Sequence, residues 1–177
     1  MSYVIKGAND YIAAMTGGVF SRFITFEGSN ILQKTPASIL AYYIINDLEK
    51  MSDPSDGDSW PLFTARLPDG PQVETNCGAV YDTSGIQGSK CMYGTVEVKP
   101  GVQLRLRGDD YDECYTKIES IALVLDDVFS VTVTIGSSIY LIQNINRTTP
   151  IVYIGTDAGT KRRFNFTVNY ALTLKIT

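Results

Sequence analysis

The chain has 177 residues, of which 44% are hydrophobic, and its formal net charge at pH 7 is only −4. This length suits one well-buried core and is short for two, and the small acidic charge is not that of a dedicated nucleic-acid binder. The sequence contains no histidine, which excludes Ser-His-Asp and Cys-His catalysis, histidine general bases and HExxH metal sites.

Two further features bear on where the protein works. No stretch reaches the ~20 apolar residues that span a bilayer, and residues 1–20 lack the ordered regions of a secretory signal. The three cysteines, Cys77, Cys91 and Cys114, have spacings that fit neither a zinc site nor a disulfide framework. We therefore expect a protein made in a cytosol-like compartment, with no membrane partner, whose cysteines are small apolar or surface residues.

The first elements are an arm and a helix. Residues 1–34 carry scattered glycines and phenylalanines without a sustained period, which indicates an extended arm or a loosely structured extension. A helix is predicted next, because Thr35 can cap it and Pro36 suits its first position. Its apolar face is expected to carry Leu40, Ile44, Leu48 and Met51. The helix should end near Pro54.

Short strands are expected after this helix. Residues 60–67 can form one strand and residues 78–81 another. Residues 83–90 contain two glycines and no period, and are predicted to form a loop. In residues 102–107 apolar and polar side chains alternate, the pattern of a half-buried strand. Its inward residues should be Val102, Leu104 and Leu106, and its outward residues include Arg105 and Arg107.

The second helix has the clearest signal of any element. Asp109 can cap it, and the acidic pair at residues 126–127 should stop it. Its apolar face is expected to carry Tyr111, Cys114, Tyr115, Ile118, Ala122 and Leu125. That face should lie on a sheet.

The rest of the chain predicts strands. Residues 131–135 and 139–144 flank a short glycine-containing turn and should form a hairpin, and residues 151–154 should form a further strand. In residues 164–176 apolar and polar side chains alternate without a break, so that at about 3.4 Å per residue the strand would be roughly 44 Å long. It should bend or reach a neighbouring subunit, and its polar face protects it poorly against pairing if it lies at a sheet edge.

Together these elements predict an α+β fold, in which an antiparallel β-sheet with a long C-terminal strand and a β-hairpin packs against two α-helices. We expect one domain over residues 35–177, with residues 1–34 as an N-terminal extension. The expected core is Leu104, Leu106, Tyr115, Ile118, Ala122, Val133, Phe166, Val168 and Tyr170.

Three acidic clusters are candidates for chemistry, and each has a plainer interpretation. Residues 53–58 resemble part of a calcium loop, but the EF-hand spacing fails and a solvated turn is favoured. Residues 109–112 include three aspartates, which are expected in the first turn of a helix because of its dipole. The acids at 126–127 suggest acid–base work, yet nothing in the sequence locates a cleft. We therefore assign no catalytic residue, metal or cofactor, and predict that the protein is not an enzyme.

Short motifs follow one another in a distinctive order between residues 76 and 125. Residues 77–85 read Cys-Gly-Ala-Val-Tyr-Asp-Thr-Ser-Gly, residues 92–95 read Met-Tyr-Gly-Thr, and residues 100–108 read Pro-Gly-Val-Gln-Leu-Arg-Leu-Arg-Gly; Tyr111, Tyr115, Lys117 and Ile118 come next. This series resembles the tail terminator and minor capsid family of tailed bacteriophages, in which a Tyr-Asp-Thr-Gly-type turn precedes a strand ending in Arg-x-Arg-Gly and a tyrosine-bearing helix. Ser84 departs from the pattern, since a second glycine is common there. About a third of the chain is covered, and none of residues 1–34.

The resemblance implies a structural virion protein of the neck. Such a subunit forms a ring, expected to be a hexamer, on the last ring of the tail tube protein, stops tail polymerisation and joins the tail to the head-completion or connector protein. DNA would pass through the lumen without sequence-specific binding. A channel through which DNA passes should not hold it by many phosphate contacts, which basic residues make. An acidic chain without basic patches is compatible with such a channel.

Contacts between subunits or rings are expected at outward-facing and loop residues, namely Arg105, Arg107, Thr132, Thr134, Lys161, Arg162 and Arg163. The basic triplet fits a solvated turn equally well. The long strand and the threonine-rich hairpin suggest sheet addition between subunits. Two alternatives stay open: a carbohydrate- or protein-binding module with exposed tyrosines in a concave patch, and a hydrolase with two acids about 5 to 10 Å apart across a cleft.

Overall fold

The computed structural model describes residues 32–68, 75–90, 96–157 and 162–176, and over these residues seven strands form one sheet in the order β1-β2-β3-β7-β5-β4, with β6 also paired to β7. The strands are β1 (Leu62–Thr64), β2 (Cys77–Lys90), β3 (Val96–Gly108), β4 (Phe129–Ile135), β5 (Ser138–Arg147), β6 (Val152–Thr156) and β7 (Phe164–Ile176). The helices are α1 (Pro36–Tyr42) and α2 (Tyr111–Asp126). The predicted α+β class is confirmed, and all strand pairs except β1–β2 are antiparallel.

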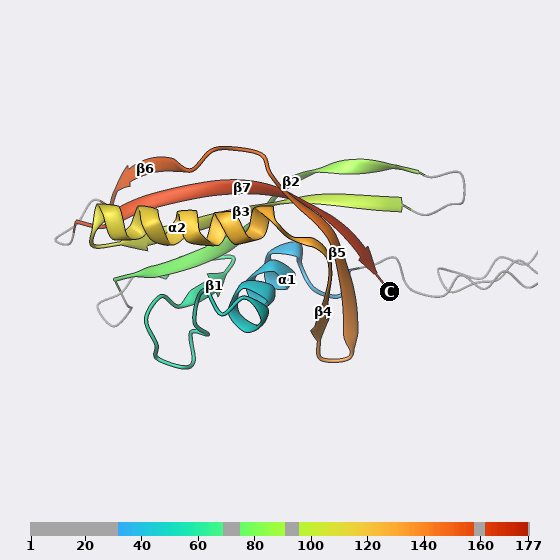
Figure 1. The fold of residues 1–177 in the computed structure, drawn as a ribbon, viewed down its shortest axis with the longest axis horizontal. Coiled ribbons are helices and arrows are strands. Elements are labelled where there is room, and N and C mark those ends of the chain that lie inside the picture. Colours follow the sequence, from blue (N-terminus) through green and yellow to red (C-terminus); the bar gives the residue numbers. More distant parts are fainter. Residues whose placement is uncertain (1–31, 69–74, 91–95, 158–161, 177) are drawn as a thin grey trace, which may run out of the picture.

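The long strand β7 lies inside the sheet. One side pairs with β3 from Gly108↔Phe164 to Val98↔Leu174, and the other pairs with β6 near its start and with β5 toward its end. The strand curves along the molecule (Figure 1). One uninterrupted strand was therefore predicted correctly, but it is not a sheet edge, so sheet addition between subunits would have to use other strands.

The core lies between the sheet and the two helices. Helix α2 packs on β3, β5 and β7, whereas α1 packs mainly on β1, β2 and β3 (Figure 1). The predicted core residues are buried, with one exception. Tyr115 is 44% exposed because it lies at the flank of α2, where its ring meets the edge of Phe166 at 5.8 Å between centroids.

Helix α1 begins as predicted and ends early. The Thr35 hydroxyl accepts a hydrogen bond from the Ser38 amide at 3.2 Å, and Pro36 is the first helical residue. After Tyr42 the helix widens into a π-helical turn, η1 (Tyr43–Asp47), and Glu49 then adopts φ +50°. A left-handed residue cannot continue a right-handed helix, so the predicted extension to Pro54 is wrong.

Replacing Thr35 with alanine should lower the free energy of unfolding by about 1 kcal/mol, because the Ser38 amide loses its side-chain acceptor. Urea unfolding measures the loss. Thr35→Ser, which keeps the hydroxyl, is the matched control and should lie close to the parent protein. Equal stability of the alanine and serine variants would contradict the assigned cap.

The second helix starts one residue later than predicted. Asp110, not Asp109, is the N-cap, and its carboxylate accepts from the Glu113 amide at 2.8 Å. The amide of Asp109 instead donates to the Asn76 side chain at 3.0 Å. The predicted end of this helix, at the acidic pair, is confirmed by its last residue, Asp126. No described helix is long and apolar enough to cross a membrane.

Two strands differ from prediction at their ends. Strand β2 runs on through the predicted loop at 83–90, with register shifts against β3 after Thr83 and after Gln87. Gly85 permits this course, because a Cβ there would collide with the Lys99 carbonyl oxygen. Strand β1 is shorter than predicted, since Trp60 and Ala65 on either side of it have φ near +60°. Hairpin β4–β5 and strand β6 lie where the sequence predicted them.

Candidate interaction surfaces

The two arginines of β3 belong to a network on the sheet face away from α2. Arg105 donates from Nε and Nη2 to Asn165 Oδ1, at 3.3 and 3.0 Å. Arg107 Nη1 lies 3.6 Å from Asp157 Oδ2, and Arg105 Nη2 lies 3.8 Å from Asp157 Oδ1. Asn165 Nδ2 donates to the same aspartate at 2.9 Å. This network fastens the end of β6 to β3 and β7.

The prediction that Arg107 faces outward into solvent is wrong. Its side chain is only 1% exposed, and its Nη2 donates to the Pro68 carbonyl at 2.9 Å and contacts Cys77 Sγ at 3.4 Å. The alternation in β3 is as predicted, but Pro68, in the segment that follows β1, lies against the second face at this point. Arg105 keeps about a third of its side chain exposed, so it alone of the pair remains available to a partner.

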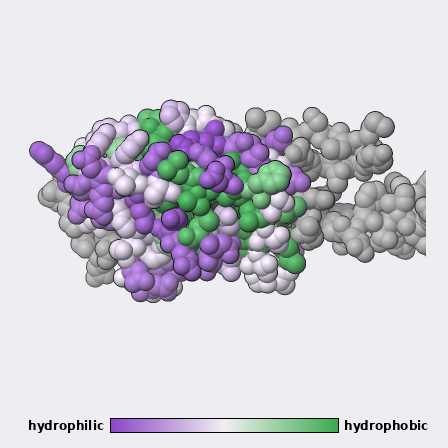
Figure 2. Space-filling view, in the orientation of Figure 1, coloured by the Kyte–Doolittle hydropathy of each residue, from purple (hydrophilic) through white to green (hydrophobic). Residues whose placement is uncertain are grey.

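Thr132 and Thr134 lie on β4, the last strand of the sheet, and both are exposed. They alternate with Val131 and Val133, which face the core. No described strand pairs with the outer side of β4. At its start Phe129 is 82% exposed, and Figure 2 shows apolar side chains gathered over the middle of one face and toward the β4–β5 hairpin.

The basic triplet before β7 is only partly described. Lys161 lies outside the described residues, Arg162 is exposed and Arg163 is half-buried. The Arg163 carbonyl accepts from the Asp157 amide at 3.1 Å and from Asn165 Nδ2 at 3.2 Å. The main chain here therefore closes the connection between β6 and β7, which agrees with the turn interpretation.

An aromatic cluster at the β6 end of the molecule was not predicted. Tyr111 meets Tyr153, Phe164 and Phe166 at 5.0 to 5.5 Å between ring centroids, with Tyr115 beside Phe166. The three tyrosines are half-exposed, while Phe166 is buried. We refer to Tyr111, Tyr115, Tyr153, Phe164 and Phe166 as the aromatic cluster. Its sequence signal, tyrosines at i and i+4 on α2, was read as core.

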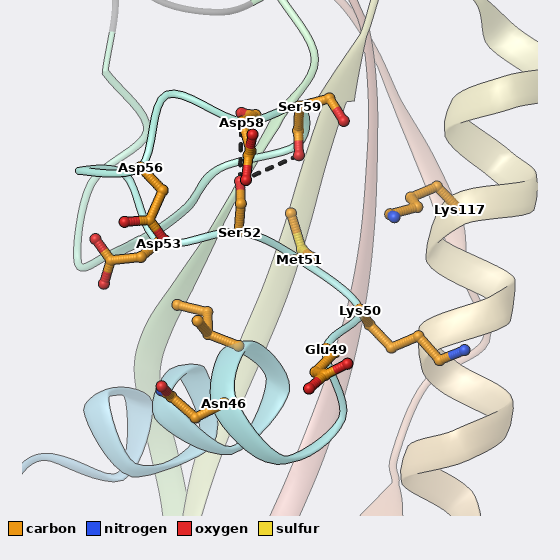
Figure 3. Close-up of a pocket in the computed structure, with 11 residues that line it drawn as sticks. Asn46, Glu49, Lys50, Met51, Ser52, Asp53, Asp56, Asp58, Ser59 and Lys117 are labelled. Atoms are coloured by element: carbon orange, nitrogen blue, oxygen red, sulfur yellow. Dashed lines mark hydrogen bonds between the residues drawn. The ribbon is translucent and has the colours of Figure 1, made fainter.

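The acidic turn at 53–58 borders a shallow depression of about 540 Å³ (Figure 3). Asp53 Oδ1 accepts from the amide and the hydroxyl of Ser55, at 2.8 and 2.6 Å, and these bonds hold the pKa of Asp53 below its usual range. A carboxyl with a lowered pKa is a poor proton donor near neutral pH. Across the depression lies Lys117, whose ammonium is 5.8 Å from the centroid of the Trp60 ring.

The other titratable groups in the core do not indicate a reactive site. Burial is the main cause that raises the pKa of Cys114 to about 12, so its thiol stays protonated and unreactive near neutral pH. Burial likewise raises the pKa of the Tyr170 hydroxyl. Among the described residues, no group of three or more acidic or cysteine side chains is placed to hold a metal ion. Among the described residues, the candidates for function are therefore exposed surfaces that a partner could contact.

Comparison with known proteins adds little to this geometry. No protein-family model matches the chain, and no curated protein matches it. Among the solved structures that match, one aligns over 76% of this chain and 93% of its own, at 16% identity and a TM-score of 0.37. A likeness of that size carries no argument about function.

Proposed function

We propose that the protein is a structural subunit of the neck of a tailed bacteriophage, a tail terminator that assembles into a hexameric ring. The ring caps the tail tube, stops its polymerisation and joins the tail to the head-completion or connector protein, with DNA passing through the lumen. In this role the protein works without catalysis or a cofactor. The order of motifs between residues 76 and 125 supports the family, as a resemblance in sequence.

The observation that carries the assembly part of the proposal is the nature of β4. An edge strand presents unpaired N–H and C=O groups, and monomeric proteins usually blunt such an edge with charges, proline or a bulge. Strand β4 has none of these: its residues are uncharged, and its register with β5 is regular from Val131 to Ile135. Its exposed threonines leave the edge accessible, as expected of a strand that pairs with another subunit.

The aromatic cluster favours one alternative, a protein-binding module. Tyrosines that are half-exposed and grouped are typical of recognition surfaces. Other tyrosines are buried: Tyr140 and Tyr170 lie in the sheet core. A monomer that captures a partner without self-assembly would favour this alternative over the ring.

Light scattering with negative-stain imaging tests the ring. The parent protein should have a mass near six subunits and show ring particles, alone or on purified tail tubes. The double variant Thr132→Lys, Thr134→Lys should lose ring assembly, because like charges would face an incoming strand at the β4 edge.

The matched control places the two lysines elsewhere, at the exposed positions Ser55 and Thr116, and should assemble normally. Rings that persist in the β4 variant would contradict the role of β4. A parent protein that stays monomeric and does not bind tail tubes would contradict the proposed function.

A further inference from the structure

Strand β6 has the composition of a buried strand but is exposed. Val152, Tyr153 and Ile154 are consecutive apolar residues, and each is between 41% and 48% exposed. Because neighbouring strand residues point to opposite faces, a run of this kind is typical of a strand covered on both faces. One edge of β6 pairs with β7, and no described strand pairs with the other. Its sequence therefore calls for cover that the described residues of the subunit do not supply.

The aromatic cluster extends this surface. Tyr153 joins β6 to the cluster, since its ring lies 5.4 Å from those of both Tyr111 and Phe166. A register shift between Tyr153 and Gly155 interrupts the regular pairing of β6. Main-chain pairing with a partner would thus be short, and most of the contact would come from burial of apolar and aromatic side chains.

The chain itself contains a segment whose composition suits this surface. Residues 19–26 read Val-Phe-Ser-Arg-Phe-Ile-Thr-Phe, which places three phenylalanines and three β-branched residues within eight positions. Such residues suit an extended segment packed on an apolar surface. The only charge is Arg22, and the cluster is bordered by the exposed acids Asp112 and Glu113 on α2.

Geometry limits how much of this segment can lie on the β6 of its own subunit. Leu32 packs against the core and Gln33 accepts a hydrogen bond from Ser138, so the described chain starts at the β4–β5 hairpin. That hairpin and β6 lie at opposite ends of β7 (Figure 1). Tyr140 pairs with Ile176 and Tyr153 with Phe166, a separation of ten residues, or about 33 Å along the strand.

Phe26 is six residues from Leu32, so even a fully extended link reaches only about 21 Å. At the same rate Arg22, ten residues from Leu32, reaches about 35 Å. Residues 23–26, half of the segment, therefore fall short of the cluster on the same subunit. A second copy, whose own hairpin lies near that cluster in an assembly, meets no such limit.

We propose that residues 19–26 of one copy dock on β6 and the aromatic cluster of a second copy, so that the N-terminal arm links neighbouring subunits. This inference rests on the proposed function, because it requires that copies assemble. It assigns β6 to the arm, whereas the ring contact proposed above uses β4.

A cross-link between two differently sized chains tests the arm contact. In a Cys91→Ser background, one chain carries Thr25→Cys and the other carries Val152→Cys, substitutions that leave every aromatic residue in place. A short bismaleimide should join the two chains, with about tenfold more product than when the second chain carries Ser55→Cys, because docking raises the local concentration of the two thiols. Adding Tyr153→Lys to the Val152→Cys chain should reduce the product to the level of the Ser55→Cys control.

The mass of each sample, measured by light scattering, separates the two proposals. Rings without the Thr25–Val152 product overturn the arm contact and leave the ring intact. A product that forms only within one chain, as shown by a chain carrying both cysteines, also overturns it. Absence of product together with absence of rings, on tail tubes as well as in solution, contradicts both proposals.

Discussion

Replacing Ile118 with aspartate should lower the free energy of unfolding by about 3 to 5 kcal/mol, enough to unfold a domain of ordinary stability. Ile118 is fully buried on the face of α2 that packs on the sheet. A carboxylate at this position would lie among the hydrophobic side chains of the core. Burying an unpaired charge is among the most costly single changes. Loss of the Ile118 side chain adds a packing penalty.

Urea unfolding followed by far-UV circular dichroism measures the effect, under conditions in which both proteins are monomeric. Thr116→Asp is the matched control, because it adds the same charge to the same helix at an exposed position. The control should change stability by less than about 0.5 kcal/mol. If both variants unfolded at the same urea concentration as the parent protein, the assigned buried face of α2 would be wrong.

The elements that the sequence predicted correctly have long, uninterrupted periods. Strand β7 alternates over its whole length, and α2 repeats its apolar residues through four turns. In such segments the local pattern alone is enough to predict the element, because every residue favours the same secondary structure and the same buried face. Hairpin β4–β5 adds turn chemistry, since Gly136 takes φ +63° between its strands.

The second half of β2, residues 83–90, was missed because its order comes from pairing with β3. Gly85 and Gly88 suggest a loop when the segment is considered alone. Pairing with β3 extends the strand to Lys90 all the same, with irregular register where the glycine lies. Local propensity in strands is weak compared with cross-strand context.

The candidate surfaces were the least predictable part, because exposure depends on chain segments that are distant in sequence. The helical period of α2 placed Tyr115 inward, and strand alternation placed the arginines of β3 outward. Neither pattern reveals that α2 leaves its N-terminal flank open, or that Pro68 approaches the second face of β3. The run Val152–Ile154 was predicted as a strand, yet its exposure could be known only from the strand order.

Arg107→Ala should destabilise the protein by about 2 to 4 kcal/mol. The substitution removes the donor to the Pro68 carbonyl and the contact with Cys77, and takes from Asp157 one of its two cationic partners. It also leaves a cavity where a long side chain was almost completely buried. Arg107→Lys should fall between the alanine variant and the parent, because an ammonium keeps the charge but lacks the planar fork that reaches these groups together.

Arg105→Ala is the control for this comparison, since Arg105 shares Asp157 but is about a third exposed, and its loss should cost about 1 kcal/mol or less. Comparing Arg107→Ala with Arg105→Ala separates a structural role of Arg107 from a role in assembly. If Arg107 acts as its burial indicates, Arg107→Ala lowers the stability of the monomer in urea unfolding. If the Arg107→Ala variant unfolded like the parent and failed only in ring assembly, that result would instead support the predicted place of Arg107 at the subunit interface.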